Sequence, residues 1–168
     1  SVEGFKNNLN ISTKVDIYKD TKDQYIYTKR VPLGVCVLIT PWNYPVFTAV
    51  QKLCPAIMLG NTVILKPSPF TPLTSLLLGE IWKDIFPPGV FNVLTGPDDR
   101  EFQLGSYLTK HPDIAKISFT GSTNTGRKIM MAASSNFKRL TLEMGGNDAA
   151  IIRDDVNIRE VAQKVLNS

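Results

Sequence analysis

Cysteine and histidine are scarce in this sequence of 168 residues, which contains two cysteines and one histidine. Cys36 and Cys54 have neither CxxC spacing nor a histidine cluster nearby, so the sequence indicates no disulfide framework and no zinc site. We therefore expect no bound metal. Two isolated cysteines are typical of a reducing, cytoplasmic compartment, where each is a small, inert hydrophobic residue.

Long apolar runs and leader signals are also missing from the sequence. No run approaches the roughly 20 residues of a membrane-spanning helix, and the first four residues lack the features of a signal peptide. We therefore expect no membrane contact. Because position 1 is serine and not methionine, we expect a mature or excised segment.

Charge of one sign does not dominate. Nineteen Lys and Arg residues face fifteen Asp and Glu residues, which gives a formal charge of +4, and these residues are scattered without forming a basic run. A structural or nucleic-acid-binding domain has only this small excess in its favour, and the sequence has no RNA-module motif. We expect no nucleic acid partner and an ordinary solvated surface.

The length allows one sizeable core, to which a smaller appendage is attached. Residues 1–30 are polar, with interleaved tyrosines, which indicates an extended or hairpin appendage. Residues 31–168 have the pattern of one α/β domain. Within it we expect strands at 31–40, 62–65, 90–94, 114–119, 139–143 and 149–152, and helices at 46–59, 71–85, 102–109, 125–134 and 158–166.

This alternation of strands and helices predicts a doubly wound, Rossmann-like parallel sheet. The first strand is an almost unbroken apolar run, as in a strand buried on both faces. In such sheets the ligand lies at the carboxyl ends of the strands. Polar or glycine-rich residues follow four of the predicted strands, at 40–44, 66–69, 120–126 and 143–147.

The segment that starts at Gly121 opens a predicted helix with small residues. Its free backbone N–H groups and the helix dipole would suit a phosphate. Thr123 stands where the dinucleotide fingerprint usually has glycine. Because an N-capped helix without a ligand gives the same pattern, this segment alone is a weak indication.

Four segments together resemble the aldehyde dehydrogenase superfamily, over a stretch from about Lys29 to at least Asp155. The segments are Pro41-Trp42-Asn43, Lys66-Pro67-Ser68, Phe119-Thr120-Gly121-Ser122-Thr123 and Glu143-Met144-Gly145-Gly146. The resemblance is to the N-terminal, cofactor-binding portion of these enzymes, cut off before the catalytic cysteine. It implies that the chain is an incomplete version of the family fold.

The resemblance also implies roles for individual residues. Asn43 would donate to the oxyanion and Glu143 would act as general base. Lys66 would bind the adenosine ribose, Ser122 the pyrophosphate, and Gly145 would lie beside the nicotinamide. The remaining implied cofactor contacts are Ile39, Thr40, Pro41, Trp42, Ser68 and Gly121.

Three of these residues have simpler interpretations. Pro41 can serve only to end a strand, Trp42 can be a packing residue, and Glu143 can be a solvated side chain at a strand end. Lys66 is harder to explain this way, because a lysine at a buried strand terminus needs an anionic or hydroxyl partner.

The sequence departs from the family at three places. Twenty-five residues follow Glu143 and none is a cysteine, while Cys36 and Cys54 lie where a thiol is inert. Pro69 stands where NAD-preferring members commonly have glutamate, which leaves NAD and NADP both open as the cofactor. Asn147-Asp148 replaces the usual Lys-Ser or Lys-Pro and has no functional interpretation.

The resemblance implies that the parent protein oxidises an aldehyde to a carboxylic acid with NAD or NADP and assembles as a homo-oligomer. The chain alone would be inactive. The alternative is a non-catalytic nucleotide-binding remnant or an interaction module. The residues that select the aldehyde lie largely outside this sequence, so the substrate is not predicted.

Overall fold

The computed structural model describes residues 15–97, 103–147 and 149–166. It contains a two-stranded antiparallel hairpin and a five-stranded parallel sheet. The hairpin strands are β1 (Asp16–Asp20) and β2 (Tyr25–Thr28), and the sheet strands are β3 (Val35–Ile39), β4 (Thr62–Lys66), β5 (Phe91–Val93), β6 (Ile114–Gly121) and β7 (Arg139–Met144).

The strand order in the large sheet is β5-β4-β3-β6-β7, and every neighbouring pair is parallel. From β3 the chain builds outward through β4 and β5, then returns to the other side of β3 and builds outward again through β6 and β7. The predicted doubly wound α/β fold is confirmed. The order reverses between β3 and β6, which is where such folds bind ligands.

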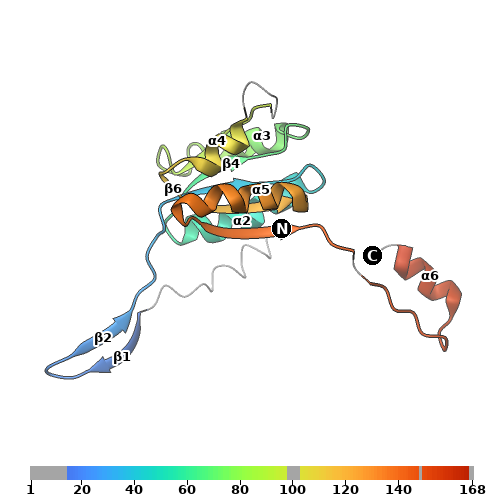
Figure 1. Ribbon diagram of the computed structural model, residues 1–168, viewed down its shortest axis with the longest axis horizontal. Coiled ribbons are helices and arrows are strands. Elements are labelled where there is room, and N and C mark those ends of the chain that lie inside the picture. The colour runs from blue at the N-terminus through green and yellow to red at the C-terminus, as the bar shows by residue number, and fades with distance from the viewer. Residues whose placement is uncertain (1–14, 98–102, 148, 167–168) are drawn as a thin grey trace.

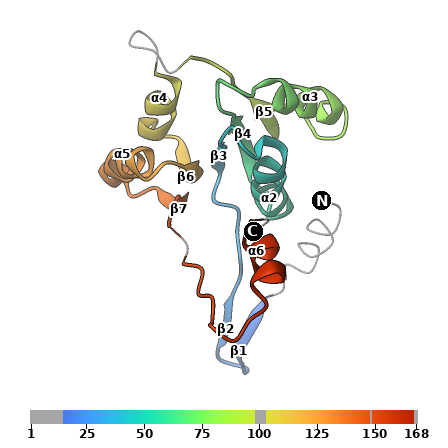
Figure 2. The ribbon, with the colours of Figure 1, turned by 90° about the vertical axis from the view of Figure 1, so that its right-hand side faces the viewer.

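Helices cover both faces of the sheet (Figure 2). On one face α2 packs on β3 and β4 while α3 packs on β5, and on the other face α4 and α5 pack on β6 and β7. The helices are α2 (Pro45–Met58), α3 (Leu73–Trp82), α4 (Leu104–Lys110), α5 (Thr123–Ala133) and α6 (Ile158–Leu166), with a short 3₁₀ turn, η1 (Ser134–Asn136), after α5. None of the helices in the described ranges is long and apolar enough to cross a membrane.

The core is two clusters, one on each face, and β3 contributes to both. Cys36 and Leu38 belong to the cluster beneath α2, whereas Val37 and Ile39 belong to the cluster beneath α4 and α5. Side chains alternate between the faces of a strand, so a continuous apolar sequence is needed when both faces are covered. The apolar run that predicted this strand is therefore explained by burial on both faces of the sheet.

The strands β6 and β7 are different, because they are apolar on one face only. Ile117 and Phe119 of β6 pack with the cluster beneath α4 and α5, and Leu142 of β7 packs against it. The alternate residues face the side that carries α2, and they are polar: Lys116, Ser118 and Thr120 in β6, Thr141 and Glu143 in β7. Half of the sheet therefore presents a polar surface beside α2.

A buried lysine fastens the opposite end of this half of the sheet. Lys138, just before β7, is 8% exposed, and its ammonium donates to the backbone carbonyls of His111 and Ile114, the latter at 2.9 Å. Burial lowers the pKa of Lys138, and the nearby Asp113 carboxylate opposes the shift. The ammonium thus joins β7 to the turn that precedes β6.

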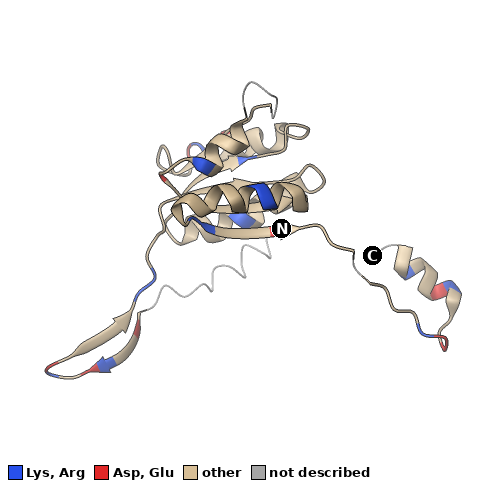
Figure 3. Ribbon diagram, viewed as in Figure 1, with Lys and Arg blue, Asp and Glu red and all other residues tan. Residues whose placement is uncertain are grey.

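The hairpin extends away from the sheet (Figure 1), in agreement with the predicted extended appendage. Its tyrosines, Tyr18, Tyr25 and Tyr27, are all exposed. Lys and Arg in the described ranges are spread over the hairpin and several helices (Figure 3). The boundary near residue 30 between an appendage and a domain stays a prediction.

Two predicted elements differ from the structure. The first buried strand begins at Val35, not Val31, and the predicted strand at 149–152 is wrong. A strand needs a partner backbone, and the chain after β7 leaves the sheet (Figure 1), so Ile151 is 91% exposed. The apolar pair in that segment, Ile151 and Ile152, indicated a buried strand, but both side chains are exposed.

Candidate functional site

The four predicted segments meet at one edge of the sheet, because the strands are parallel and in register. Ile39 at the end of β3 lies opposite Lys66 of β4 on one side and Phe119 of β6 on the other. Thr120 of β6 lies opposite Glu143 of β7. Neighbouring strands are about 4.8 Å apart. The residues that follow these strands therefore form one row across the point where the strand order reverses.

The loop from β3 to α2 leaves this edge directly. The amide of Thr40 donates to the Lys66 carbonyl at 3.2 Å, and Pro41 follows, so the strand ends there. The Ile39 side chain belongs to the core, which leaves its backbone at the edge. Trp42 is 64% exposed, so the packing interpretation fails within the described chain, and Asn43 is exposed beside it.

Thr40 is 3% exposed, and its hydroxyl oxygen has no hydrogen-bond partner among the described residues. An unsatisfied buried hydroxyl costs free energy and is uncommon in folded proteins. This hydroxyl lies one residue beyond β3, in the row of strand ends. The Thr40 hydroxyl is therefore a buried polar group at the strand ends whose hydrogen-bond partner does not come from the described part of the chain.

The segment after β4 turns sharply into α3. Lys66 is 4% exposed and Ser68 is 8% exposed, and the Ser68 hydroxyl accepts the Phe70 amide at 3.3 Å. The Thr71 amide donates to the Ser68 carbonyl at 3.1 Å. The turn therefore holds the Lys66 backbone at the edge, and its lysine side chain is enclosed as the sequence indicated. Pro69 in the same turn is exposed.

The glycine-rich segment opens α5. Ser122 is the N-cap of this helix, and its hydroxyl oxygen accepts the Thr125 amide at 3.2 Å. Gly121 is needed for packing, because a Cβ there would collide with the Phe119 ring. The remaining free N–H groups of the first turn lie at the same edge as Thr120. The helix start therefore has the form that the phosphate hypothesis requires, while its serine side chain serves the cap.

Glu143 and Gly145 lie at the end of β7. Glu143 is exposed on the polar face of the sheet, and Gly145 follows the end of the strand. A Cβ at Gly145 would have no protein atom within 4 Å among the described contacts. Space beside this residue is therefore open, as a bound ring would require, and packing within the described chain does not explain the glycine.

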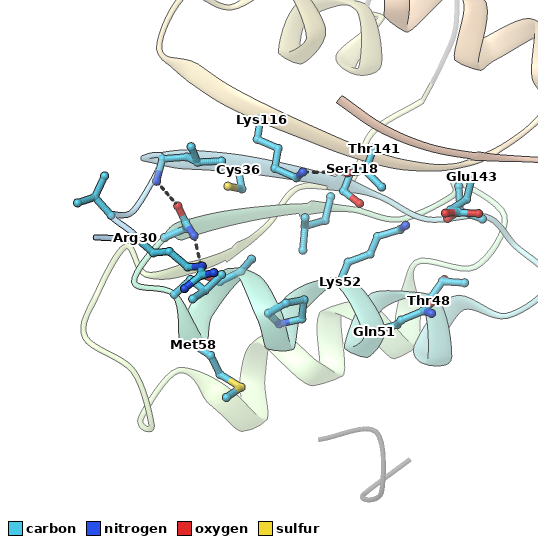
Figure 4. A pocket seen from close by; sticks show the side chains of 18 residues that line it. Arg30, Cys36, Thr48, Gln51, Lys52, Met58, Lys116, Ser118, Thr141 and Glu143 are labelled. Atoms are coloured by element: carbon cyan, nitrogen blue, oxygen red, sulfur yellow. Dashed lines mark hydrogen bonds between the residues drawn. The ribbon is translucent and has the colours of Figure 1, made fainter. Parts of the chain in front are cut away.

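A cavity of about 830 Å³ lies beside this row, between α2 and the polar face of β6 and β7 (Figure 4). Glu143 lines it at β7, and Thr48, Gln51 and Lys52 line it from α2. The N-terminal turn of α2 is held by the Thr48 hydroxyl, which donates to the Tyr44 carbonyl at 2.7 Å. The candidate base Glu143 therefore borders the cavity and also lies at the strand ends.

Lys52 is the residue that sequence reasoning missed. Its side chain is 8% exposed and points into the cavity (Figure 4). Burial lowers the pKa of Lys52, attraction to the Glu143 carboxylate raises it, and repulsion from Lys116 lowers it further. A single charged residue in an otherwise uncharged helical stretch was the available signal, together with polar residues alternating in two strands.

Neither cysteine belongs to this row. Cys36 and Cys54 are 1% and 3% exposed, both are free, and burial raises the pKa of each thiol. A neutral, enclosed thiol is a poor nucleophile. The described residues also contain no cluster of His, Cys, Asp and Glu side chains that could hold a metal ion.

Comparisons with known proteins agree with the geometry. The model of the aldehyde dehydrogenase family matches residues 5–168. FUS7 of Gibberella fujikuroi, named as an aldehyde dehydrogenase, is 51% identical over 146 residues, which is 87% of this chain and 31% of FUS7.

Solved structures give the same result. The betaine aldehyde dehydrogenase of Staphylococcus aureus in complex with NAD+ is 32% identical, with a TM-score of 0.88 over 97% of this chain and 32% of that enzyme. An aldehyde dehydrogenase of Bartonella henselae is 37% identical, with a TM-score of 0.86 over 98% of this chain and 34% of that protein. The chain thus spans about a third of the length of the relatives it matches.

Proposed function

The chain belongs to the aldehyde dehydrogenase family, and we propose that it forms the cofactor-binding segment of an NAD(P)-dependent enzyme that oxidises aldehydes to carboxylic acids. The observation that carries this proposal is the meeting of four polar strand ends at the point where the strand order reverses. A sheet of this type binds its ligand at that position.

The residues present fit a dinucleotide. The buried Thr40 hydroxyl has no partner in the described chain, the first turn of α5 offers free N–H groups, and space is open at Gly145. Lys66 would bind the ribose, and Ser122 with Gly121 would border the pyrophosphate. Ile39, Pro41, Trp42 and Ser68 complete the proposed contacts. When bound, the nicotinamide would accept the hydride of the aldehyde.

Two residues are proposed for the chemistry itself. The exposed Asn43 amide would donate to the oxygen on which negative charge develops. Such a donor typically lowers the activation free energy by about 3 to 4 kcal/mol. The Glu143 carboxylate would remove a proton from water for the hydrolytic step. Both belong to the same edge of the sheet, since Asn43 follows β3 and Glu143 ends β7.

The nucleophile must come from elsewhere, so we propose that this chain alone does not oxidise aldehydes. Cys36 lies beneath α2 in the core and Cys54 is within α2 itself, and neither thiol reaches the row of strand ends. The alternative is a non-catalytic remnant that at most binds nucleotide, or an interaction module; the remnant shares the nucleotide site and lacks the catalysis, whereas the module needs no nucleotide.

The cofactor choice is proposed to include NADP as well as NAD. Pro69 is exposed in the turn after Lys66 and offers no carboxylate to accept ribose hydroxyls or to repel a 2′-phosphate. A lysine near that position would favour the additional phosphate. We therefore expect a smaller preference for NAD than a glutamate at position 69 would give.

Partners and location are proposed from the same membership. The aldehyde is a small molecule, and the exposed tyrosines of the hairpin suit contacts within a homo-oligomer of the full enzyme. Two buried, free cysteines fit a cytoplasmic compartment.

Calorimetric titration of the folded chain with NAD+ and with NADP+ tests the proposal. We expect saturable binding of at least one of them, weakened at least tenfold by Lys66→Ala and unchanged by Lys164→Ala on α6. Circular dichroism would verify that each variant is folded. A folded wild-type chain that binds neither nucleotide would disprove the cofactor role, and with it the proposed function.

A further inference from the structure

We propose that Met144, the last residue of β7, is an oxidation-sensitive modification site, and that conversion of its thioether to the sulfoxide displaces the first turn of α5 from the end of the sheet. The modification would weaken nucleotide binding, and this consequence alone rests on the proposed function. The oxidation and the displacement of α5 are independent of it.

The position of Met144 in the sheet provides the first argument. Its register partner in β6 is Gly121, and Ser122, which follows Gly121, is the N-cap of α5. Side chains alternate between the faces of a strand. Leu142 packs against the cluster beneath α4 and α5, and Glu143 lines the cavity on the other face, so Met144 returns to the face that carries α5 (Figure 2). Met144 therefore lies beneath the turn that is proposed to border the pyrophosphate.

The Met144 sulfur packs directly on the backbone of α5. A Cβ added to the buried Gly126 would overlap this sulfur, so the thioether occupies the space that a side chain at position 126 would need. The Phe119 ring borders the same point, 3.6 Å from the added Cβ. Contacts of a thioether with an aromatic ring are favourable. The absence of a side chain at Gly126 thus permits a close contact that leaves little room for another atom between the sulfur and the helix.

Gly126 also makes the first backbone hydrogen bond of α5. Its amide donates to the carbonyl of Ser122 at 3.0 Å, and the Thr125 amide donates to the Ser122 hydroxyl at 3.2 Å. These two bonds fix the first turn of the helix, where the remaining N–H groups are free to meet a ligand. A displacement of Gly126 therefore changes the proposed pyrophosphate contacts within the same helical turn.

The chemistry requires an oxidant that reaches the sulfur, and we assign this role to hydrogen peroxide. Met144 is 43% exposed, so a molecule of this size can approach its side chain from solvent. The S–O bond forms as the O–O bond of the peroxide breaks, the sulfur gives up two electrons, and the rest of the peroxide leaves as water. The sulfoxide is polar and chiral, so it fits poorly in an apolar contact, and methionine sulfoxide reductases reverse the step.

The other three methionines provide internal controls. Met130 and Met131, in the last turns of α5, are 56% and 69% exposed, so their sulfoxides would face solvent. Met58 ends α2 and lines the cavity. Replacing these three residues with leucine leaves Met144 as the single methionine of the sequence.

The first experiment treats the folded 168-residue chain with hydrogen peroxide and maps the sulfoxides by mass spectrometry. Trypsin separates the sites, because Met144 lies in the peptide 140–153 and Met131 lies in the peptide 129–138. We expect Met144 to be oxidised at a rate within about tenfold of that of the more exposed Met131. Backbone amide chemical shifts should then change at Gly126 and its neighbours in the first turn of α5.

The second experiment measures the consequence by calorimetric titration with NAD+ and NADP+. Oxidation of the wild-type chain should weaken nucleotide binding by about tenfold, and a methionine sulfoxide reductase should restore it. Met144→Leu, which keeps an apolar side chain of similar volume, should retain its affinity after peroxide treatment. The chain with leucine at the other three positions should lose affinity as the wild type does. Circular dichroism would verify that each variant is folded.

Three results would overturn the inference. They are a Met144 that stays reduced while Met131 is oxidised, a Met144 sulfoxide that leaves the Gly126 amide shift unchanged, and a peroxide-treated Met144→Leu chain that loses as much affinity as the wild type. If the untreated wild-type chain binds neither nucleotide, the proposed function fails. The oxidation rate of Met144 and the Gly126 amide shift then decide the inference by themselves.

Discussion

Replacing Lys52 with methionine should stabilise the chain, although the substitution removes a charged side chain that lines the cavity beside α2. Methionine keeps a flexible apolar stem of similar length and gives up the charge. Replacing buried charges with apolar residues is often neutral or stabilising by about 1 to 4 kcal/mol. Because attraction to Glu143 and repulsion from Lys116 oppose each other, desolvation dominates at Lys52. We expect the free energy of unfolding to rise by about 1 to 2 kcal/mol at pH 7.

Urea denaturation of both chains measures this difference, and tryptophan fluorescence monitors the transition. Trp82 contributes to this signal, and its ring centroid lies 5.3 Å from that of Phe91. The pH dependence has a definite sign. The folded-state pKa of Lys52 is below 10.5, the ordinary value that applies in the unfolded chain. Between these two values the unfolded chain binds more protons, so wild-type stability gains with rising pH. The methionine variant lacks this gain, so its advantage should shrink between pH 7 and pH 10.

Two results would refute this reasoning about Lys52. The first is a methionine variant that is less stable than the wild type by more than about 1 kcal/mol, since this would mean that the ammonium is satisfied in the folded chain. The second is a stability difference that does not change with pH. Lys128→Met, an exposed substitution on α5, should stay within about 0.5 kcal/mol of the wild type and serves as the control.

Three further predictions concern the core, the buried Lys138 before β7 and the two thiols. Leu53→Ala should cost about 3 kcal/mol in urea denaturation, because Leu53 of α2 is 0% exposed in the cluster between α2 and the sheet, whereas Leu166→Ala, at a residue 84% exposed, should cost less than about 0.5 kcal/mol. Lys138→Met should cost about 2 kcal/mol in the same assay, because the carbonyls of His111 and Ile114 would lose a charged donor. An unchanged denaturation midpoint would contradict this role of the Lys138 ammonium. Both cysteines should resist a thiol reagent at pH 8 in the native chain and react quickly in urea, and rapid native labelling of either would contradict its burial.

The sequence predicted the sheet well where one physical cause explained the pattern. A strand covered on both faces must be apolar throughout, and Val35–Ile39 is such a run. The turn and cap residues around Lys66 and Ser122 then located two strand ends, and parallel topology brought them to one edge. Burial of Lys66, which an apolar strand before it indicated, is also observed.

The rest depends on contacts between segments far apart in the sequence. Residues 149–152 look like a buried strand, yet a strand forms only beside a partner backbone, and these residues pair with no strand in the part of the chain that the structure describes. The cavity was missed because it needs Lys52 of α2 to face Lys116 of β6, and no local pattern relates these two positions. The roles of the residues at the strand ends stay predictions until binding is measured.

The position of the strand ends between two halves of the sheet has a consequence for how the chain folds. The strands β3, β4 and β5 follow one another closely, so they can pair early with small loops. Pairing of β3 with β6 closes a far longer loop, whose entropic cost is recovered only when the second half docks. We therefore expect the row of strand ends to be completed in the last step of folding. A nucleotide that binds only the completed site would then stabilise the fully folded chain relative to every half-folded form. The population in which the two halves of the sheet are separated would fall as the nucleotide concentration rises.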